Sequence, residues 1–434
     1  MAFVYCAFGE CAKSELDLFS LKPTQTSIEN SFFMEVLPLA ALTPLAPIEF
    51  CVSGSRDMYL DLNNTLLHLV CKITKANGTN IEDDAKVARI AYPITTMFNQ
   101  VDINLGNWLV TQSDNMYTYR AYIESILSYS RKALDTQLSA GLFYKDTEAH
   151  FEDTSFDGGD AGFKKRTSFA AGSKQFDLLG CVHSDLLFQD KLLVNDIDLK
   201  IKFNRNKDAL FICGDAEQYK LVILSRSLFV KRVKVSLSVR LAHAEALQLS
   251  NAKYAIERVA LKILSIPAGT RLMQHQNLFL GQLQKLIIIE FVDNTAFSGL
   301  YTSNPFNFKH YDINYTALVH AGAVIPAKPF TPSFGTSSFV REYLGLVRIM
   351  RKHLQDSGVV VSREGYGAGY TLFEFDLTPD MEDDDHYNLI KNGNLKAEIR
   401  FTQVLATNVN MVVFSVFNSV IQVNHARQLM LDYH

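Results

Sequence analysis

The sequence LKAEIRFT at residues 395–402 alternates apolar and polar side chains at every position. Successive side chains of a β-strand point to opposite faces, so Leu395, Ala397, Ile399 and Phe401 share one face and the polar residues share the other. The pattern is typical of a strand with one face on a core. It recurs at residues 67–73, 101–105, 197–203 and 233–239. Two further runs, 286–292 and 409–416, are apolar on both faces and predict strands that are buried on both sides.

The segments between these strands favour an antiparallel arrangement. Asn77-Gly78 and Asn392-Gly393 are typical of tight turns, whereas residues 151–172 and 326–339 indicate long loops. Helices are few: we expect one over residues 116–134, which carry an apolar stripe, and a shorter one over 242–249. A parallel sheet would need a helix between most strands, so the pattern predicts Greek-key sandwiches.

The size and charge of the chain exclude several classes of protein. Its 434 residues suffice for two or three domains, and 48% hydrophobic against 20% charged residues can supply packed cores. A protein that coats nucleic acid directly usually has a strong basic excess, whereas this chain has a net charge of −4. Six thinly spread cysteines fit a reducing compartment. We expect neither a signal peptide nor a membrane span, which needs roughly 18 consecutive apolar residues.

Several segments resemble chemical sites but lack the required spacing. Gly365–Gly369 has neither a dinucleotide fingerprint nor a Walker lysine, so we expect a glycine-rich loop. The run Met381–His386 predicts a solvated acidic turn, because its carboxylates are consecutive rather than alternating. Cys6 and Cys11 lack a second pair to complete a zinc site, and Lys164–Arg166 predicts an exposed loop. HExxH and GxSxG motifs are absent from the sequence, so we expect no catalytic, cofactor-binding or metal-binding residues, and no cofactor.

A series of short blocks runs in order from Leu18 to Tyr433. They read LFSLKPTQTSIE (18–29), PIEF (47–50), YLDL (59–62), YTYRAYIE (117–124), HSDLLFQD (183–190), NLFLGQL (277–283), NPFNF (304–308), GYTLFEFDLTPD (369–380) and LDY (431–433). In sequence and in order, these blocks resemble the major capsid proteins of Maverick/Polinton elements and adintoviruses. Ala255 and Gln284 depart from that pattern, in which proline is usual at both positions.

The resemblance implies a double jelly roll, that is, two eight-stranded antiparallel sandwiches with a few short helices and long loops. It implies a structural protein rather than an enzyme, whose homotrimers present six similar lobes and tile the icosahedral shell of a DNA virus or virus-like element. The expected partners are neighbouring capsomers, penton proteins and minor capsid proteins, without sequence-specific contact to nucleic acid. The expected location is the virion capsid, assembled in the host nucleus or cytoplasm.

The expected division of the chain is an N-terminal arm over residues 1–44, a first jelly roll over 45–250 and a second over 251–434. The boundary near Ser250 follows from residues 242–249, which interrupt the strand pattern in the middle of the chain. The arm is expected because residues 1–44 contain three prolines and alternate weakly.

The candidate subunit contacts are aromatic residues in irregular, Pro-rich segments of the second half. They are Phe306, Phe308, Tyr311, Phe330, Phe334 and Phe339. The same side chains could instead pack on their own domain, and the sequence leaves both alternatives open. The sequence also speaks against two other functions. A secreted jelly-roll lectin or receptor-binding protein would need a signal peptide, and an enzyme on a cupin scaffold would need a His/Glu metal cluster, whose HxH motif is absent from the sequence.

Overall fold

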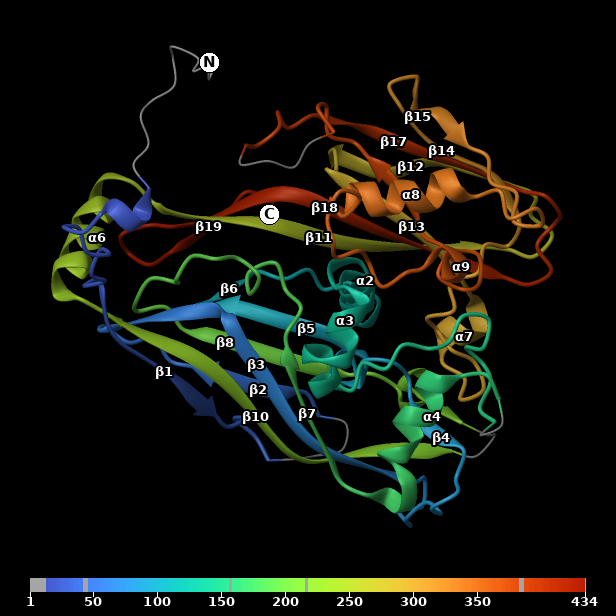
Figure 1. Cartoon of the computed structure of the whole chain (residues 1–434), viewed down its shortest axis with the longest axis horizontal. Coiled ribbons are helices and arrows are strands. Elements are labelled where there is room, and N and C mark those ends of the chain that lie inside the picture. Colours follow the sequence, from blue (N-terminus) through green and yellow to red (C-terminus); the bar gives the residue numbers. More distant parts are fainter. Residues whose placement is uncertain (1–12, 42–45, 156–157, 215–217, 382–385, 434) are drawn as a thin grey trace.

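Strands dominate the computed structural model (Figure 1), which describes residues 13–41, 46–155, 158–214, 218–381 and 386–433. Strands hold 41% of the residues and helices 19%, which confirms the predicted all-β class. The long strands of both halves run lengthwise through the molecule (Figure 1).

The first half of the chain folds into two four-stranded antiparallel sheets and a small third one. Sheet A consists, in spatial order, of β1 (Ile28–Val36), β10 (Tyr219–Val235), β3 (Met58–Lys75) and β7 (Phe176–Cys181). Sheet B consists of β2 (Ile48–Val52), β8 (Leu199–Arg205), β5 (Phe98–Leu105) and β6 (Trp108–Leu109). Sheet C pairs β4 (Val87–Arg89) with β9 (Ile212–Gly214).

The second half of the chain forms two more antiparallel sheets. Sheet D consists of β11 (Ala252–Ile266), β18 (Val409–Val423), β13 (Leu286–Asp293) and β16 (Phe373–Asp376), and β19 (Leu429–Leu431) pairs with β18. Sheet E consists of β12 (Leu272–Gln282), β17 (Asn392–Phe401), β14 (Ile313–His320) and β15 (Ala323–Phe330).

The two halves share one strand order. With sheet C set aside, the eight strands of the first half can be numbered along the chain, and sheet A then follows the order 1-8-3-6 and sheet B the order 2-7-4-5. The same numbering of β11 to β18 gives 1-8-3-6 for sheet D and 2-7-4-5 for sheet E. This is the strand order of a jelly roll. It occurs twice, so the predicted double jelly roll is confirmed.

The N-terminal segment differs from the expected arm. β1 pairs antiparallel with β10 from Ile28 opposite Val235 to Val36 opposite Leu228, and it is strand one of the first roll. Its alternation is weak because it is an edge strand that backbone bonds hold in place while most of its side chains stay exposed. Of the expected arm, residues 13–27 are exposed outside the sheets, and residues 1–12 and 42–45 lie outside the described residues.

The helices lie in the connections between strands. They are α1 (Pro93–Thr96), α2 (Tyr117–Ser128), α3 (Arg131–Asp135), α4 (Ala161–Ser168), α5 (Asp208–Phe211), α6 (Leu237–Leu249), α7 (Asn294–Ser298), α8 (Val340–Ile349) and α9 (Arg363–Tyr366), with 3-10 turns at Ser14–Leu16, Gln137–Gly141 and Ala171–Ser173. The helix predicted over 116–134 is split into α2 and α3 at the extended residue Tyr129. The helix predicted over 242–249 is the second part of α6. No helix in the described part of the chain is long and apolar enough to cross a membrane.

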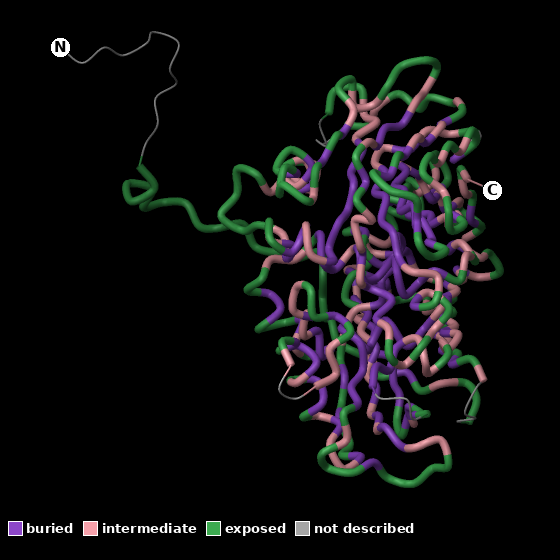
Figure 2. The backbone as a smooth tube through the Cα atoms, turned by 90° about the vertical axis from the view of Figure 1, so that its right-hand side faces the viewer, coloured by how far each residue is buried: buried purple, intermediate pink, exposed green. Residues whose placement is uncertain are grey.

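Sheet D is covered on both faces, which explains the two runs that are apolar throughout. On β13, Ile287 and Ile289 belong to the core inside the second roll, whereas Ile288 and Val292 belong to the core shared with the first roll. β18 alternates in the same way. The first roll therefore packs on the outer face of sheet D, and buried backbone runs through the middle of the molecule (Figure 2).

Candidate functional site

The junction between the two rolls is built around α2. This helix buries ten of its twelve residues, because it lies between its own roll and the outer face of sheet D (Figure 1). Tyr122 stacks on Phe306 of the second roll with ring centroids 3.9 Å apart, and Tyr119 contacts Phe297 at 5.5 Å. Such ring pairs contribute about 0.5–1.5 kcal/mol each beyond the area that they bury. The aromatic residues of α2 therefore hold the rolls together.

Two of the six predicted subunit contacts lie at this junction. Phe306 and Phe308 are fully buried against Tyr119 and Tyr122 of the same chain. Their own chain covers both rings, and it does so through α2 of the first roll rather than through their own domain. The rings turn inward because burial removes their apolar surface from water.

The other four predicted contacts also pack within the second roll. Phe330 and Phe339 are buried, and the half-buried Phe334 stacks on His310 at 4.1 Å and on Phe339 at 5.3 Å. Tyr311 is half-buried against the interior core of the same roll. The irregular segments thus cover the ends of the roll instead of projecting from it.

A buried polar cluster crosses the same junction. Arg166 on α4 is fully buried, and it donates to the Asp146 carboxylate and, from Nε, to the Arg89 carbonyl at 2.6 Å. Asp146 also accepts from the Asn304 amide at 3.0 Å, and its backbone carbonyl accepts from Tyr370 Oη at 2.9 Å. Asn304 and Tyr370 belong to the second roll. Buried charges need such partners, so the cluster joins the two rolls through directional bonds.

The α4 segment differs from its predicted form. Residues 164–166 were expected in an exposed loop, but they lie on a helix that turns Arg166 into the interior. Asp160 is the N-cap of this helix and accepts from the Gly162 N–H at 3.0 Å. Burial, together with the nearby Asp146 carboxylate, raises the pKa of Asp160 to about 6. The basic side chain at position 166 therefore has a structural role.

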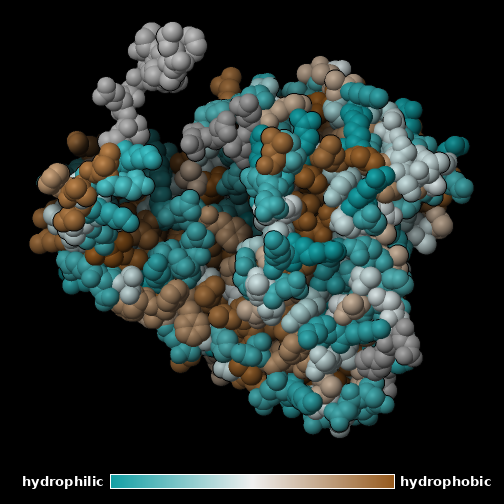
Figure 3. Space-filling model, in the orientation of Figure 1, coloured by the Kyte–Doolittle hydropathy of each residue, from teal (hydrophilic) through white to brown (hydrophobic). Residues whose placement is uncertain are grey.

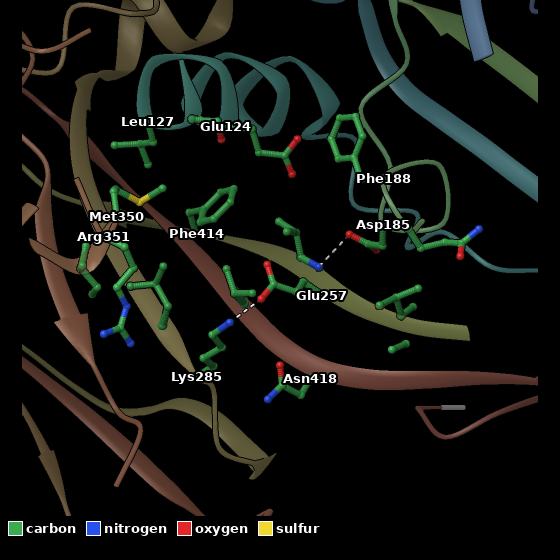
Figure 4. Close-up of a pocket in the computed structure, with 18 of the residues that line it drawn as sticks. Glu124, Leu127, Asp185, Phe188, Glu257, Lys285, Met350, Arg351, Phe414 and Asn418 are labelled. Atoms are coloured by element: carbon green, nitrogen blue, oxygen red, sulfur yellow. Dashed lines mark hydrogen bonds and ion pairs between the residues drawn. The ribbon is translucent and has the colours of Figure 1, made fainter. Parts of the chain in front are cut away.

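A cleft of about 880 Å³ opens beside the junction (Figure 4). One wall comes from α2 and the segment 183–191 of the first roll, and the other from β11, β13 and β18 of the second. Leu127, Met350 and Phe414 make part of this lining apolar. The cleft marks a part of the junction where the two rolls leave open space between them.

Four of the titratable side chains in the first-roll wall, Arg120, Glu124, His183 and Asp185, contact one another. Arg120 lies between the carboxylates of Glu124, at 2.9 Å, and Asp185. His183 Nδ1 is 2.7 Å from Glu124, and Asp185 accepts from the Val259 N–H of the second roll at 3.1 Å. Burial raises the pKa of Asp185 although Arg120 opposes it, and burial also acts on Glu124, where Arg120 and His183 outweigh it and lower the pKa. These groups form a structural link between the rolls.

The segments that resemble chemical sites pack as structural elements where they are described. Gly369 has a φ of +108°, and a Cβ there would come within 2.2 Å of the Phe151 ring, so glycine is required by a close approach. His386 lies 2.8 Å from Asp380, whereas residues 382–385 of the predicted acidic turn, like Cys6 and Cys11, lie outside the described residues. No group of three His, Cys, Asp or Glu side chains that could hold a metal is found in the described ranges.

Four parts of the chain carry groups of large apolar side chains that stay exposed. Among the exposed side chains are Leu16, Leu18, Phe19 and Leu21 before the first sheet, Phe32 and Phe33 on β1, Leu237, Leu241 and Leu249 on α6, and Val340 and Leu344 on α8. Figure 3 shows apolar side chains gathered at the end of the molecule where α6 lies. Large exposed apolar patches are rare on soluble monomers, so these surfaces are stronger candidates for subunit contact than the six aromatic residues. The sequence signal was present on α8, where apolar residues recur at helical spacing.

The chain is similar to known proteins over its whole length. No family model matches it. An uncharacterised protein of Caenorhabditis elegans is 22% identical over 424 residues, which cover 94% of this chain and 99% of that protein. A chain of the Sputnik virophage structure matches with a TM-score of 0.70 at 13% identity, covering 99% of this chain and 94% of that one.

Two further structures show the same likeness. The PBCV-1 virus capsid matches with a TM-score of 0.59 at 10% identity, over 96% of this chain and 99% of that one. The mavirus major capsid protein matches with a TM-score of 0.52 at 10% identity, over 100% and 97%. Both rolls are covered in each comparison. The chain therefore has the double jelly-roll fold of the major capsid proteins of DNA viruses and virophages.

Proposed function

We propose that this chain is the major capsid protein of a DNA virus or a virus-like element, with a structural and not a catalytic role. The observation that carries the proposal is the repetition of one jelly-roll strand order within a single chain. Three such chains present six similar lobes around one axis, and a six-lobed unit tiles a near-hexagonal shell. The likeness to capsid proteins over the whole chain supports the same function.

The exposed apolar surfaces support an obligate homotrimer. A monomer would leave the apolar side chains of β1 and α8 in water, and burying them between chains removes that cost. Interfaces of permanent oligomers bury roughly 2,000 Å² or more, and we expect this class for the trimer. Contacts between capsomers would be smaller and more polar.

The proposed function also implies which partners the chain binds and where it is located. Neighbouring capsomers, penton proteins and minor capsid proteins are the proposed partners, and the virion is the proposed location, after assembly in the host nucleus or cytoplasm. The net charge of −4 supports a shell without sequence-specific contact to the genome. A relative of the chain is found in a nematode. This supports a virus-like element that is carried in an animal genome as one source of such a chain. We also propose that the first roll begins with β1, and we keep the boundary near Ser250.

The test is the mass and assembly of the purified full chain. Light scattering should give about three times the chain mass of 48.8 kDa, and electron microscopy of the protein or of expressing cells should show closed shells or six-lobed capsomers. A protein that remains a soluble, folded monomer at micromolar concentration would contradict the proposal.

A further inference from the structure

The shared strand order assigns each strand of sheet A a counterpart in sheet D. β1, β10, β3 and β7 occupy the positions that β11, β18, β13 and β16 occupy in the second roll. The outer face of sheet D is covered by the first roll of the same chain. The outer face of sheet A holds the equivalent position in the first roll, and apolar side chains there are still partly exposed.

These side chains form one surface, which we call the sheet A face: Phe33, Leu66, His68, Val70, Leu179 and Phe229. The register places them together, because Leu66 lies opposite Phe229 and His68 lies opposite Leu179. The His68 and Phe229 rings are 6.2 Å apart. Phe33 is 52% exposed, and Figure 3 shows apolar side chains where Figure 1 places β1 and β10.

The helix that covers sheet D also has a counterpart. α2 lies in the connection between the fifth and sixth strands of the first roll, and α8 lies in the same connection of the second. α2 starts eight residues after β6 (117 − 109), and α8 starts ten residues after β15 (340 − 330). The two helices differ in how many of their residues are buried: α2 buries ten of its twelve residues, and α8 buries only two of its ten.

The uncovered side of α8 is apolar. Val340, Leu344 and Val347 are spaced by four and three residues, so they lie along one stripe of the helix. Val340 and Leu344 are 44% and 48% exposed, whereas Leu346 is fully buried in the second roll. The helix is thus anchored on one side and presents a second apolar stripe outward.

We infer that α8 of one chain docks on the sheet A face of a second copy, as α2 docks on sheet D within one chain. The inference rests on the proposed trimer, which supplies the second copy. The sheet A face is bordered by acidic side chains, Glu35 and Asp177, and by basic ones, Lys72 and Lys231, so the apolar surfaces and not charge carry the contact. The two surfaces lie on different rolls, so each chain gives one contact and receives one, as a closed ring requires.

The first test is a cross-link in the full-length chain. The variants are made in a background in which Cys6, Cys11, Cys51 and Cys181 are replaced by serine, because Cys181 lies opposite Leu66 on the sheet A face. A variant with both Leu344→Cys and Phe229→Cys, treated with a short bismaleimide, should give covalent two-chain and three-chain species on a denaturing gel. Each single variant, and a control that pairs Phe229→Cys with Val404→Cys in the exposed loop between β17 and β18, should give few. Equal cross-linking in the control and the test pair would overturn the inference.

The second test uses charge on each surface. Leu344→Glu and Phe229→Glu should each abolish the trimer, whereas Val404→Glu, in the exposed loop between β17 and β18, should keep it. In each single variant one surface is intact, so co-expression of the two should yield a two-chain complex that neither forms alone. The wild-type chain separates the two proposals: a monomeric wild type contradicts the capsid trimer, whereas a wild-type trimer that both charged variants preserve contradicts only this contact. The cross-link decides the matter if a charged variant does not fold.

Discussion

Glu290 is a single carboxylate in the middle of the apolar strand β13. It is fully buried at the junction of the rolls, and neither carboxylate oxygen has a hydrogen-bond partner among the described residues. Burial raises the pKa of Glu290 well above its ordinary value of 4.5. Below about that value both the folded and the unfolded chain hold the proton. Above it only the unfolded chain releases the proton, so the folded state loses roughly 1.4 kcal/mol for each pH unit until the folded pKa is reached.

We therefore predict that Glu290→Gln removes this loss. The free energy of unfolding of the variant, relative to that of the wild type, should rise with pH above about 4.5 until the pKa of Glu290 in the folded chain is reached. Urea unfolding at fixed protein concentration measures it at several pH values. Glu245→Gln on the exposed part of α6 is the matched control and should leave the pH dependence unchanged. Parallel pH profiles for Glu290→Gln and the wild type would contradict a protonated Glu290.

A second prediction concerns the buried Arg166. Arg166→Met leaves the carboxylates of Asp146 and Asp160 buried without their cation, and breaking such a pair typically costs about 3–5 kcal/mol. The double variant Arg166→Met with Asp146→Asn removes both charges of the shorter pair and should lose less stability than the single variant. Thermal unfolding of the three proteins measures the difference. A single variant as stable as the double would show that the pair is not coupled.

At the scale of residues the sequence predicted little of the candidate site. Alternation tells which side chains of a strand face a core, but it does not tell which neighbour an aromatic loop residue meets. The sequence left a second chain or its own domain as partners of Phe306, and only the fold shows the stack on Tyr122 of the other roll. Arg166 looked exposed because charged residues usually are, and its partners Asp146 and Arg89 are distant in sequence.

At the scale of elements, the sequence predicted most of the long strands but not the edge strand β1. The strands β3, β5, β8, β13, β17 and β18 alternate or are apolar throughout, and all were expected. The strand predicted over 233–239 was wrong in its bounds, because β10 ends at Val235 and α6 begins at Leu237. β1 was missed because backbone pairing holds an edge strand without requiring a buried face. The split between α2 and α3 was also missed, since the apolar stripe shows no break at Tyr129.

The exposed segment before β1 allows a third prediction. Leu18 and Phe19 are 78% and 98% exposed, so they make little contact within their own chain. Deleting residues 1–19 should spare the trimer and its thermal stability, but raise the protein concentration needed for shell formation by about tenfold or more. Burial of one such side chain is worth about 1.5–3 kcal/mol, and 1.4 kcal/mol corresponds to tenfold.

Light scattering during assembly measures that concentration. The matched control is a chain of full length with Leu18→Ser and Phe19→Ser, which should behave as the deletion does if these side chains make the contact. Loss of soluble protein on deletion would instead show that the segment belongs to a core.

At the scale of the whole molecule, the chain contains one junction, in which the first roll covers the outer face of sheet D. The equivalent outer face of sheet A is left uncovered. The sequence predicted two rolls because the family resemblance implied them, and it could not show that their strand orders are identical, since pairing partners such as β3 and β10 are far apart in the chain. It could also not show that the outer face of sheet A is uncovered. That property depends on the relative position of two domains, which no local pattern encodes.

The open junction leads to the last prediction, that dissociation and unfolding are nearly one event. Each separated chain would expose the sheet A face, the stripe of α8 and β1 at once, so the free chain loses the burial that stabilises it. The temperature of unfolding should therefore rise with protein concentration, as it does for obligate oligomers. Scanning calorimetry over a hundredfold range of concentration, with light scattering at the lowest one, measures both quantities. A melting temperature that is independent of concentration, together with a folded monomer on dilution, would show that the rolls of one chain are stable alone and that the trimer is a later, separable step.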